Sequence, residues 1–370
     1  MRSSIGISSS VRKAGGTSRM IHNTQLPDSP DMHFGLFSVA DHYPNELNRH
    51  VGELYDEILE QINLADTLGF ESFWLAEHHF HEYGAIPRPA LMLAAAARTT
   101  TRIRLGAAVV VLPFDTPLRT AEDFAMVDQL SGGRLVLGVG SGYLKHEFEG
   151  FGITPEEKRG RFDEGLEVLL KAWSGERFTH SGEHFTIRDV ALNVVPVARP
   201  HPPLWVAILS NGAAYHVGRR GLPIMTIPYA TTESFKELEE TASAFRTGFA
   251  ESGKDASEGS IRFGLHVHCA ETTEQARAEA REAMERYVRT RLYAKDRSFD
   301  ELIAKDLVAF GDPEEVCRVL RRYEEAGMTH VMAITSFGGM SHGTVKRSLH
   351  LLAEEVLPRL GRNADVRVSG

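Results

Sequence analysis

The stretch ESFWLAEHHFHEYG, residues 71–84, ends an apolar run with three imidazoles, His78, His79 and His81, directly after Glu77. An imidazole titrates close to neutral pH, so a group of this kind can move protons during a reaction. Neutral imidazoles and carboxylates are also common ligands of zinc. The stretch therefore indicates one of two chemistries, a proton-transfer centre or a metal site.

A metal site would start from His79 and His81, because their H-x-H spacing resembles that of zinc hydrolases with a barrel fold. Such a site needs further ligands from other strand ends. Most of the other apolar runs end in Leu, Ser, Pro, Tyr or Thr, and only His266 and His268 add imidazoles. Those two are two residues apart and share one face of a strand. We expect no metal, and a metallohydrolase stays open as an alternative.

Small residues mark two further segments that could hold a ligand. GVGSGY (138–143) is not the G-x-G-x-x-G fingerprint, and no acidic ribose ligand follows it at the required distance, so a dinucleotide site is not expected. SNGAAYHVG (210–218) follows an apolar run and opens a short helix, whose N-terminus could bind a phosphate or simply be capped. Glycines at 106, 138, 140 and 142 would let a flat aromatic ring approach the backbone closely. An isoalloxazine ring with its phosphate would use both segments.

Eight apolar runs rich in β-branched and aromatic residues are the expected strands. They are residues 33–40, 72–77, 103–112, 134–140, 203–209, 222–227, 261–269 and 330–336. The runs are mostly continuous rather than alternating, which is typical of parallel strands buried on both faces.

Helical patterns separate the strands and end at a glycine just before the next one. Residues 54–65 carry an apolar stripe at helical spacing, and Gly69, Gly221 and Gly327 each stand where a helix should give way to a strand. Repeated strand–helix units of this number predict a (β/α)8 TIM barrel with insertions, with an open doubly wound sheet as the rival fold. In a barrel the active groups lie at the carboxyl ends of the strands, which places the EHH group on the catalytic rim.

Two insertions and two terminal segments complete the expected organisation. FTHSGEHFTIRDV (178–190) predicts a hairpin. Residues 291–311 predict an irregular insertion, which is the candidate for a lid over the mouth of the barrel. The barrel domain should span 32–360, after a disordered leader (1–31) that lacks the apolar core of a secretory signal and before a tail (361–370). Met20 and Met32 are alternative starts.

Composition excludes several classes of function. The net charge of −9 argues against nucleic acid or anionic lipid as a partner, and no apolar run approaches the length of a membrane span. Cys269 and Cys317 are the only cysteines, far apart in the sequence, which indicates a reducing compartment. We therefore expect a cytoplasmic enzyme that acts on a small molecule.

An ordered set of segments resembles the luciferase-like, flavin-dependent monooxygenase family. The segments are FWLAEHHF, VLPFDTPLRTAEDFAMVDQLSGGRLVLGVGSGY, KHEFEGFGI, RGRFDEGLEVLLKAW, PLWVAILSNGAAYHVGRRGLPIM and FGDPEEV, between residues 32 and 358. No single segment is decisive, but their order along the chain is highly specific.

The resemblance implies a set of site residues. Glu77 and His78 would face the flavin, with His78 the catalytic imidazole and His79 beside it. The ring would lie against Ala40, Ala108, Val109, Gly140 and Tyr143, and the FMN phosphate against Ser210, Asn211, Gly212 and Ala213. Family members often carry a non-proline cis peptide on the third strand, here between Ala108 and Val109. Ser141, in the GVGSGY segment, replaces an arginine that luciferase uses on the phosphate, and Leu209 replaces a glutamate. Another group must therefore meet the phosphate charge.

The resemblance also implies a reaction and its partners. Reduced FMN would react with O2 to a C4a-(hydro)peroxyflavin that oxygenates a small organic substrate. The reduced flavin would come from a separate NAD(P)H-flavin reductase, since no segment has the complete dinucleotide fingerprint. A homodimer is expected, with the apolar helix at 90–97 as a contact. The alternatives are an F420- or FMN-dependent enzyme that transfers hydride without inserting oxygen, and a non-catalytic flavin-binding protein.

Overall fold

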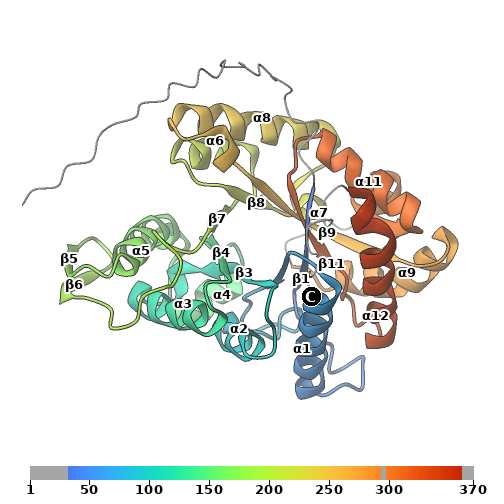
Figure 1. Ribbon diagram of the computed structural model, residues 1–370, viewed down its shortest axis with the longest axis horizontal. Helices are drawn as coiled ribbons and strands as arrows, with labels where there is room; N and C mark the ends of the chain where they lie inside the picture. The colour runs from blue at the N-terminus through green and yellow to red at the C-terminus, as the bar shows by residue number, and fades with distance from the viewer. Residues whose placement is uncertain (1–31, 293–296, 361–370) are drawn as a thin grey trace, which may run out of the picture. The chain divides into compact units, whose positions relative to one another are not determined.

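Eight parallel strands form a closed barrel in the computed structural model, which describes residues 32–292 and 297–360 (Figure 1). The strands are β1 (His33–Ser38), β2 (Ser72–Leu75), β3 (Arg104–Val111), β4 (Leu135–Gly140), β7 (Leu204–Ala207), β8 (Ile224–Thr226), β9 (Ile261–Cys269) and β11 (His330–Ile334). Each pairs in parallel with the next, and β11 pairs back with β1. Every predicted apolar run contains one of these strands. The predicted TIM barrel is confirmed, and the open doubly wound sheet is wrong.

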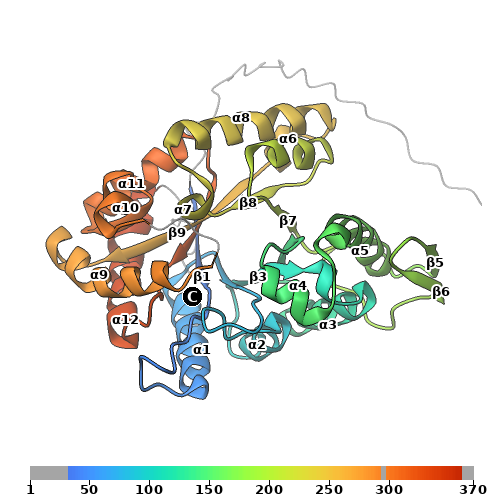
Figure 2. The ribbon, with the colours of Figure 1, turned by 180° about the vertical axis from the view of Figure 1, so that it is seen from behind.

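Helices follow the strands and surround the barrel. They are α1 (Val51–Leu68), α2 (Pro89–Ala97), α3 (Pro117–Ser131), α4 (Lys145–Phe151), α5 (Lys158–Trp173), α6 (Asn211–Arg219), α7 (Pro228–Thr231), α8 (Phe235–Glu251), α9 (Thr273–Arg289), α10 (Phe299–Ala304), α11 (Pro313–Glu325) and α12 (His342–Leu351). In both ribbon views α1 and α12 lie side by side on the wall of the barrel (Figures 1 and 2).

Helix α1 shows how the sequence sets these elements. The predicted stripe is buried along its whole length, from Leu54 to Ala65. At its start the His50 side chain accepts a hydrogen bond from the Gly52 backbone at 3.1 Å. At its end Gly69 has a φ of 85°, a left-handed conformation that favours glycine. The chain can therefore turn directly from α1 into β2, as predicted.

The predicted hairpin is present as β5 (Phe178–Ser181) and β6 (Thr186–Val190), paired antiparallel next to α5 (Figures 1 and 2). The prediction of an irregular insertion at 291–311 is wrong for its second half, while residues 293–296 lie outside the described residues. The segment contains α10 and a further strand, β10 (Val308–Gly311), which pairs with the last four residues of β9, beyond the reach of β8. Because β9 extends past its neighbour, its free edge recruits β10, a pairing that the local sequence does not reveal.

Large side chains close the barrel at the amino-terminal ends of its strands. The guanidinium of Arg262 lies between the indoles of Trp74 and Trp205, 5.0 and 4.2 Å from the two ring centroids. Gly106 makes room for this layer, because a Cβ there would overlap the Trp74 ring. Burial lowers the pKa of Arg262, and Glu71 supplies a counter-charge at 3.3 Å. This end of the barrel is filled, so an open site has to lie at the other end.

Both proposed terminal segments, 1–31 and 361–370, lie outside the described residues. Within the part of the chain that the structure describes, no helix is long and apolar enough to cross a membrane. Cys269 and Cys317 are both buried and free.

Candidate active site

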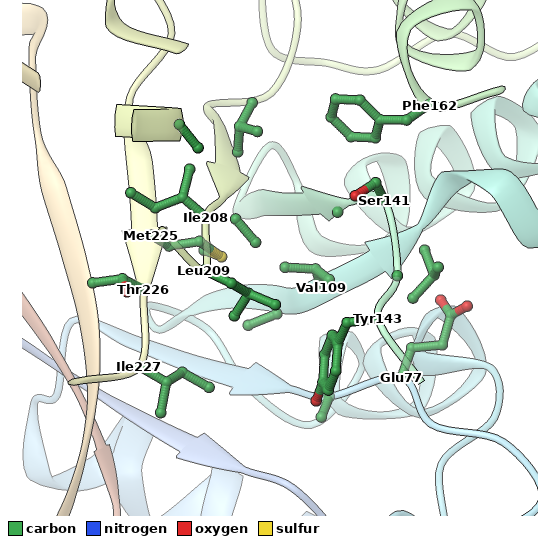
Figure 3. A pocket seen from close by; sticks show the side chains of 18 of the residues that line it. Glu77, Val109, Ser141, Tyr143, Phe162, Ile208, Leu209, Met225, Thr226 and Ile227 are labelled. Carbon is green, nitrogen blue, oxygen red and sulfur yellow. The ribbon is translucent and has the colours of Figure 1, made fainter. Parts of the chain in front are cut away.

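A cavity of about 250 Å³ opens at the carboxyl ends of the strands, where the predicted rim lies. Its walls come from the ends of β1, β2, β3, β4, β7 and β8, from β11, and from the starts of α5 and α6. Figure 3 shows the labelled side chains around it. Ten of the residues singled out from the sequence line this cavity: Glu77, His78, Ala108, Val109, Gly140, Ser141, Gly142, Tyr143, Leu209 and Ala213. The fold therefore brings both predicted segments, the histidine group and the small-residue loops, to one place.

His78 is the imidazole that borders the cavity, and a carboxylate holds it from behind. Its Nδ1 lies 3.2 Å from Oε1 of Glu147 on α4, a side chain that is almost completely buried. A carboxylate only accepts hydrogen bonds, so Nδ1 carries the hydrogen and Nε2 is the basic nitrogen. Burial lowers the pKa of His78, and the contact with Glu147 opposes that shift. The pair holds a neutral imidazole at neutral pH, with Nε2 able to take up a proton.

His79 does not line the cavity. Its Nε2 lies 3.1 Å from Oε1 of Glu77, and its ring packs edge-on against Phe114 and Phe151 at 5.9 and 4.7 Å between centroids. Its backbone N–H donates to the same Glu147 oxygen that meets His78, at 2.9 Å. Burial raises the pKa of Glu77, while the hydrogen bond from His79 opposes that shift. In this geometry His79 contacts Glu77, which borders the cavity, and does not border the cavity itself.

The proposed ring site is built from backbone and small side chains on β3 and β4. Ala108, Val109, Gly140, Ser141 and Tyr143 all border the cavity. The peptide between Ala108 and Val109 is cis, which confirms the prediction made for that bond. A Cβ on Gly140 would lie 2.7 Å from a Val109 methyl group, so only glycine fits beside this strand. The result is a flat-walled slot of the kind that an aromatic ring can enter.

Ala40 is placed differently from the other residues proposed for the ring. It is buried, does not border the cavity, and has a φ of 55°, which is unusual for a residue with a Cβ. Its backbone N–H donates to Ser38 Oγ at 3.1 Å, and its carbonyl accepts from the Ala85 N–H at 2.8 Å. Ala40 therefore joins the end of β1 to the loop that carries His78.

The proposed phosphate site is the exposed N-terminus of α6. Ala213 borders the cavity, whereas Ser210, Asn211 and Gly212 are exposed beside it, and Thr241 Oγ1 donates a hydrogen bond to the Asn211 carboxamide oxygen. A helix N-terminus favours an anion through its backbone N–H groups and its dipole.

Two cations from the first turn of α5, Lys158 and Arg159, also line the cavity. They are candidates for the positive charge that Ser141 does not supply. The slot lined by the ends of β3 and β4, the α6 N-terminus and these cations could together hold a ligand with a flat ring and an anionic group, as a flavin-type cofactor has.

Sequence reasoning missed Glu147, Lys158 and Arg159. Glu147 lies within the KHEFEGFGI segment that carries the family resemblance, but no spacing rule links it to His78, 69 residues earlier. Lys158 and Arg159 open a helix whose charged residues suggest an ordinary solvated face. Because Ser141 replaces an arginine, the sequence did indicate that another cation was needed. It did not indicate which residue would supply that cation.

The metal alternative finds no support on the rim. Within residues 32–292 and 297–360, one group of three side chains could hold an ion, His33, Glu71 and His330. It lies at the amino-terminal ends of the strands, away from His79 and His81. The His33 and His330 rings are stacked at 4.2 Å, and the guanidinium of Arg262 already meets Glu71. That neighbouring positive charge disfavours a divalent cation there.

The comparisons with known proteins agree on one family. The family model described as luciferase-like monooxygenase matches residues 32–330. The chain is 29% identical to limonene 1,2-monooxygenase of Rhodococcus erythropolis, covering 84% of this chain and 83% of the relative. It is 27% identical to the oxygenase component of flavin-dependent trigonelline monooxygenase of Acinetobacter baylyi, covering 88% and 95%.

Two further comparisons bear on fold and cofactor. The crystal structure of monooxygenase RslO1 from Streptomyces bottropensis is 32% identical and superposes with a TM-score of 0.83 over 89% of this chain and 99% of the other. F420-dependent glucose-6-phosphate dehydrogenase of Amycolatopsis mediterranei is 26% identical, covering 82% of this chain and 94% of the relative. Oxygenases and deazaflavin enzymes are therefore both among the relatives.

Proposed function

Because the chain belongs to the luciferase-like monooxygenase family, we propose that it uses reduced FMN and O2 to insert one oxygen atom into a small organic substrate. The observation that carries the proposal is the His78–Glu147 pair at the edge of a cavity whose remaining walls fit FMN. Relatives named as flavin-dependent and limonene monooxygenases support the reaction class.

When bound, FMNH2 would supply two electrons and two protons, so that one atom of O2 would go to the substrate and the other would leave as water. The residues of the chain bind, orient and move protons. Lys158, Arg159 and the α6 N-terminus would hold the phosphate, and the slot beside Gly140 would hold the ring. His78 would exchange a proton at Nε2 during the oxygen chemistry, with Glu147 keeping the hydrogen on Nδ1.

A separate reductase should supply the reduced flavin. The sequence has no complete dinucleotide fingerprint, and one relative is named as an oxygenase component. FMN would then be a shuttling substrate rather than a tightly held group, so the purified protein should be nearly colourless.

A homodimer is part of the proposal. Helices α2 and α3 pack on each other, and Leu91 and Met126 on them are 74% and 54% exposed. Exposed apolar side chains on neighbouring helices are typical of a contact between subunits.

Hydride transfer with F420 is the second candidate function, because an F420-dependent dehydrogenase is among the relatives. Anaerobic titration of the protein with FMNH2, FMN and F420 separates the two. We expect FMNH2 to bind more tightly than FMN, F420 not to bind, and NADH to be oxidised only when a flavin reductase is added. Tight F420 binding would favour the dehydrogenase, and direct NADH oxidation with stoichiometric yellow FMN would favour a self-sufficient flavin enzyme.

A further inference from the structure

The cavity has two unlike sides. Ser141, Tyr143 and Glu77 lie on one side, and Ile208, Met225 and Ile227 lie across the space from them (Figure 3). The first side adjoins the proposed ring slot and the His78–Glu147 pair. The second is the wall that a substrate would contact when the flavin occupies the slot.

Every carboxylate that borders the cavity is already engaged. Glu77 meets His79 Nε2 at 3.1 Å, and Glu147 accepts from the His79 backbone and meets His78. Both carboxylates therefore belong to the side of the cavity that carries the His78–Glu147 pair, and not to the opposite wall. The cations of the lining, Lys158 and Arg159, come from α5, where the proposal above assigns them to the cofactor phosphate.

The opposite wall carries no ionisable side chain. Its inner part consists of Phe37 on β1, Met225 on β8, Ile227 directly after β8, and Met332 on β11. Thr226 is the polar member of this wall, and its hydroxyl lies 3.3 Å from the Thr231 hydroxyl. A formal charge placed against this wall would lose its hydration without gaining a counter-ion.

We propose that the substrate is an uncharged, largely apolar molecule, with hydrogen-bonding groups limited to neutral ones such as a carbonyl or a hydroxyl, and that Ile227 is a determinant of this preference. The inference rests on the proposed function, since the flavin defines which wall remains for the substrate. Ile227 is chosen because it borders the cavity and also packs closely against the backbone of Gly264. A Cβ added at Gly264 would lie 3.3 Å from Ile227 Cγ1.

Three probes of matched shape test the proposal: isopropylcyclohexane, cyclohexanecarboxamide and cyclohexanecarboxylate. Each is titrated into the full-length protein saturated with FMN, and binding is followed by the flavin difference spectrum. We expect the carboxylate to bind at least about 100-fold more weakly than the hydrocarbon, with the neutral amide between them. Equal affinities, including an equal failure to bind, would overturn the inference. Failure of FMN itself to bind would instead contradict the proposed function, and the inference with it.

A charge placed on the wall should reverse the preference. Ile227→Arg keeps a similar volume and adds a permanent cation. We expect it to weaken hydrocarbon binding and to strengthen carboxylate binding at least about 10-fold, because the buried anion then gains a partner. Val197→Arg is the matched control, since Val197 is half-exposed and does not border the cavity. An Ile227→Arg protein that binds FMN normally but keeps the wild-type order of affinities would exclude Ile227 as a determinant.

Discussion

Glu147→Gln is the most informative substitution at this site. The carboxylate is almost completely buried, and its Oε1 meets both the His78 Nδ1 at 3.2 Å and the His79 backbone N–H at 2.9 Å. Glutamine has the same shape and keeps an oxygen for the His79 N–H. It removes the negative charge beside His78. Because one oxygen meets both histidines, the amide oxygen that accepts from the His79 N–H also accepts from His78 Nδ1 and keeps the hydrogen there. The change therefore lowers the basicity of His78 while sparing its tautomer and the fold.

The size of the effect follows from the lost contact. A hydrogen bond to a charged group contributes about 1.5–3 kcal/mol, and about 1.4 kcal/mol corresponds to one pKa unit. Burial already lowers the pKa of His78 and the contact with Glu147 raises it, so removal of the negative charge should lower that pKa further. The neutral imidazole then persists to lower pH. Turnover at neutral pH should fall about 10- to 100-fold, because the basic nitrogen is weaker without the neighbouring negative charge.

Two measurements check this expectation. The pKa of His78 is read directly by NMR titration of its imidazole, and the rate at which bound FMNH2 reacts with O2 is recorded across the same pH range. Glu149→Gln is the matched control, because Glu149 lies on the same helix, is 64% exposed and pairs with Lys145 at 3.4 Å. An unchanged His78 titration in the Glu147 variant, or an equal shift in the Glu149 variant, would refute the reasoning.

Four further outcomes are expected. His78→Ala should reduce turnover by about 10²–10⁴-fold while FMN still binds, and near-normal turnover would remove His78 from the mechanism. Lys158→Ala should weaken FMN at least about 10-fold but leave riboflavin binding unchanged, with Lys171→Ala, a surface cation paired with Glu167 on the same helix, as the control. Among the residues that the structure describes, neither ring nitrogen of the fully buried His266 has a hydrogen-bond partner, and burial lowers the pKa of His266 to about 3. Since the unfolded chain binds a proton that the folded chain does not, stability should fall as pH drops from about 6.5 toward that value, and His266→Leu should flatten this loss in acid denaturation curves. Leu91→Glu should convert the proposed dimer to a monomer in light scattering, and a dimer that survives would place the contact elsewhere.

The strands, their order and the location of the rim were predictable from the sequence because they depend on local chemistry. Continuous apolar runs rich in β-branched and aromatic residues are typical of strands buried on both faces, and glycines such as Gly69 accept a left-handed turn that other residues resist. The barrel then follows from repetition of one unit, and barrel geometry alone puts His78 at the carboxyl end of β2. The resemblance to a known family added the cofactor and the cis bond after Ala108, neither of which residue spacing could supply.

Tertiary structure decided which of the clustered side chains work together. His78 and His79 are neighbours in sequence, yet one borders the cavity and the other turns into a group of phenylalanines, because the chain bends between aromatic rings contributed by α4 and the loop before α3. The partner of His78 lies 69 residues away on α4, and the cations that line the cavity come from α5. The strand β10 forms because β9 extends beyond the end of β8, and the edge of β9 that β8 does not reach pairs with β10. Each of these depends on contacts between segments that are distant in sequence, and local propensity carries no information about such contacts.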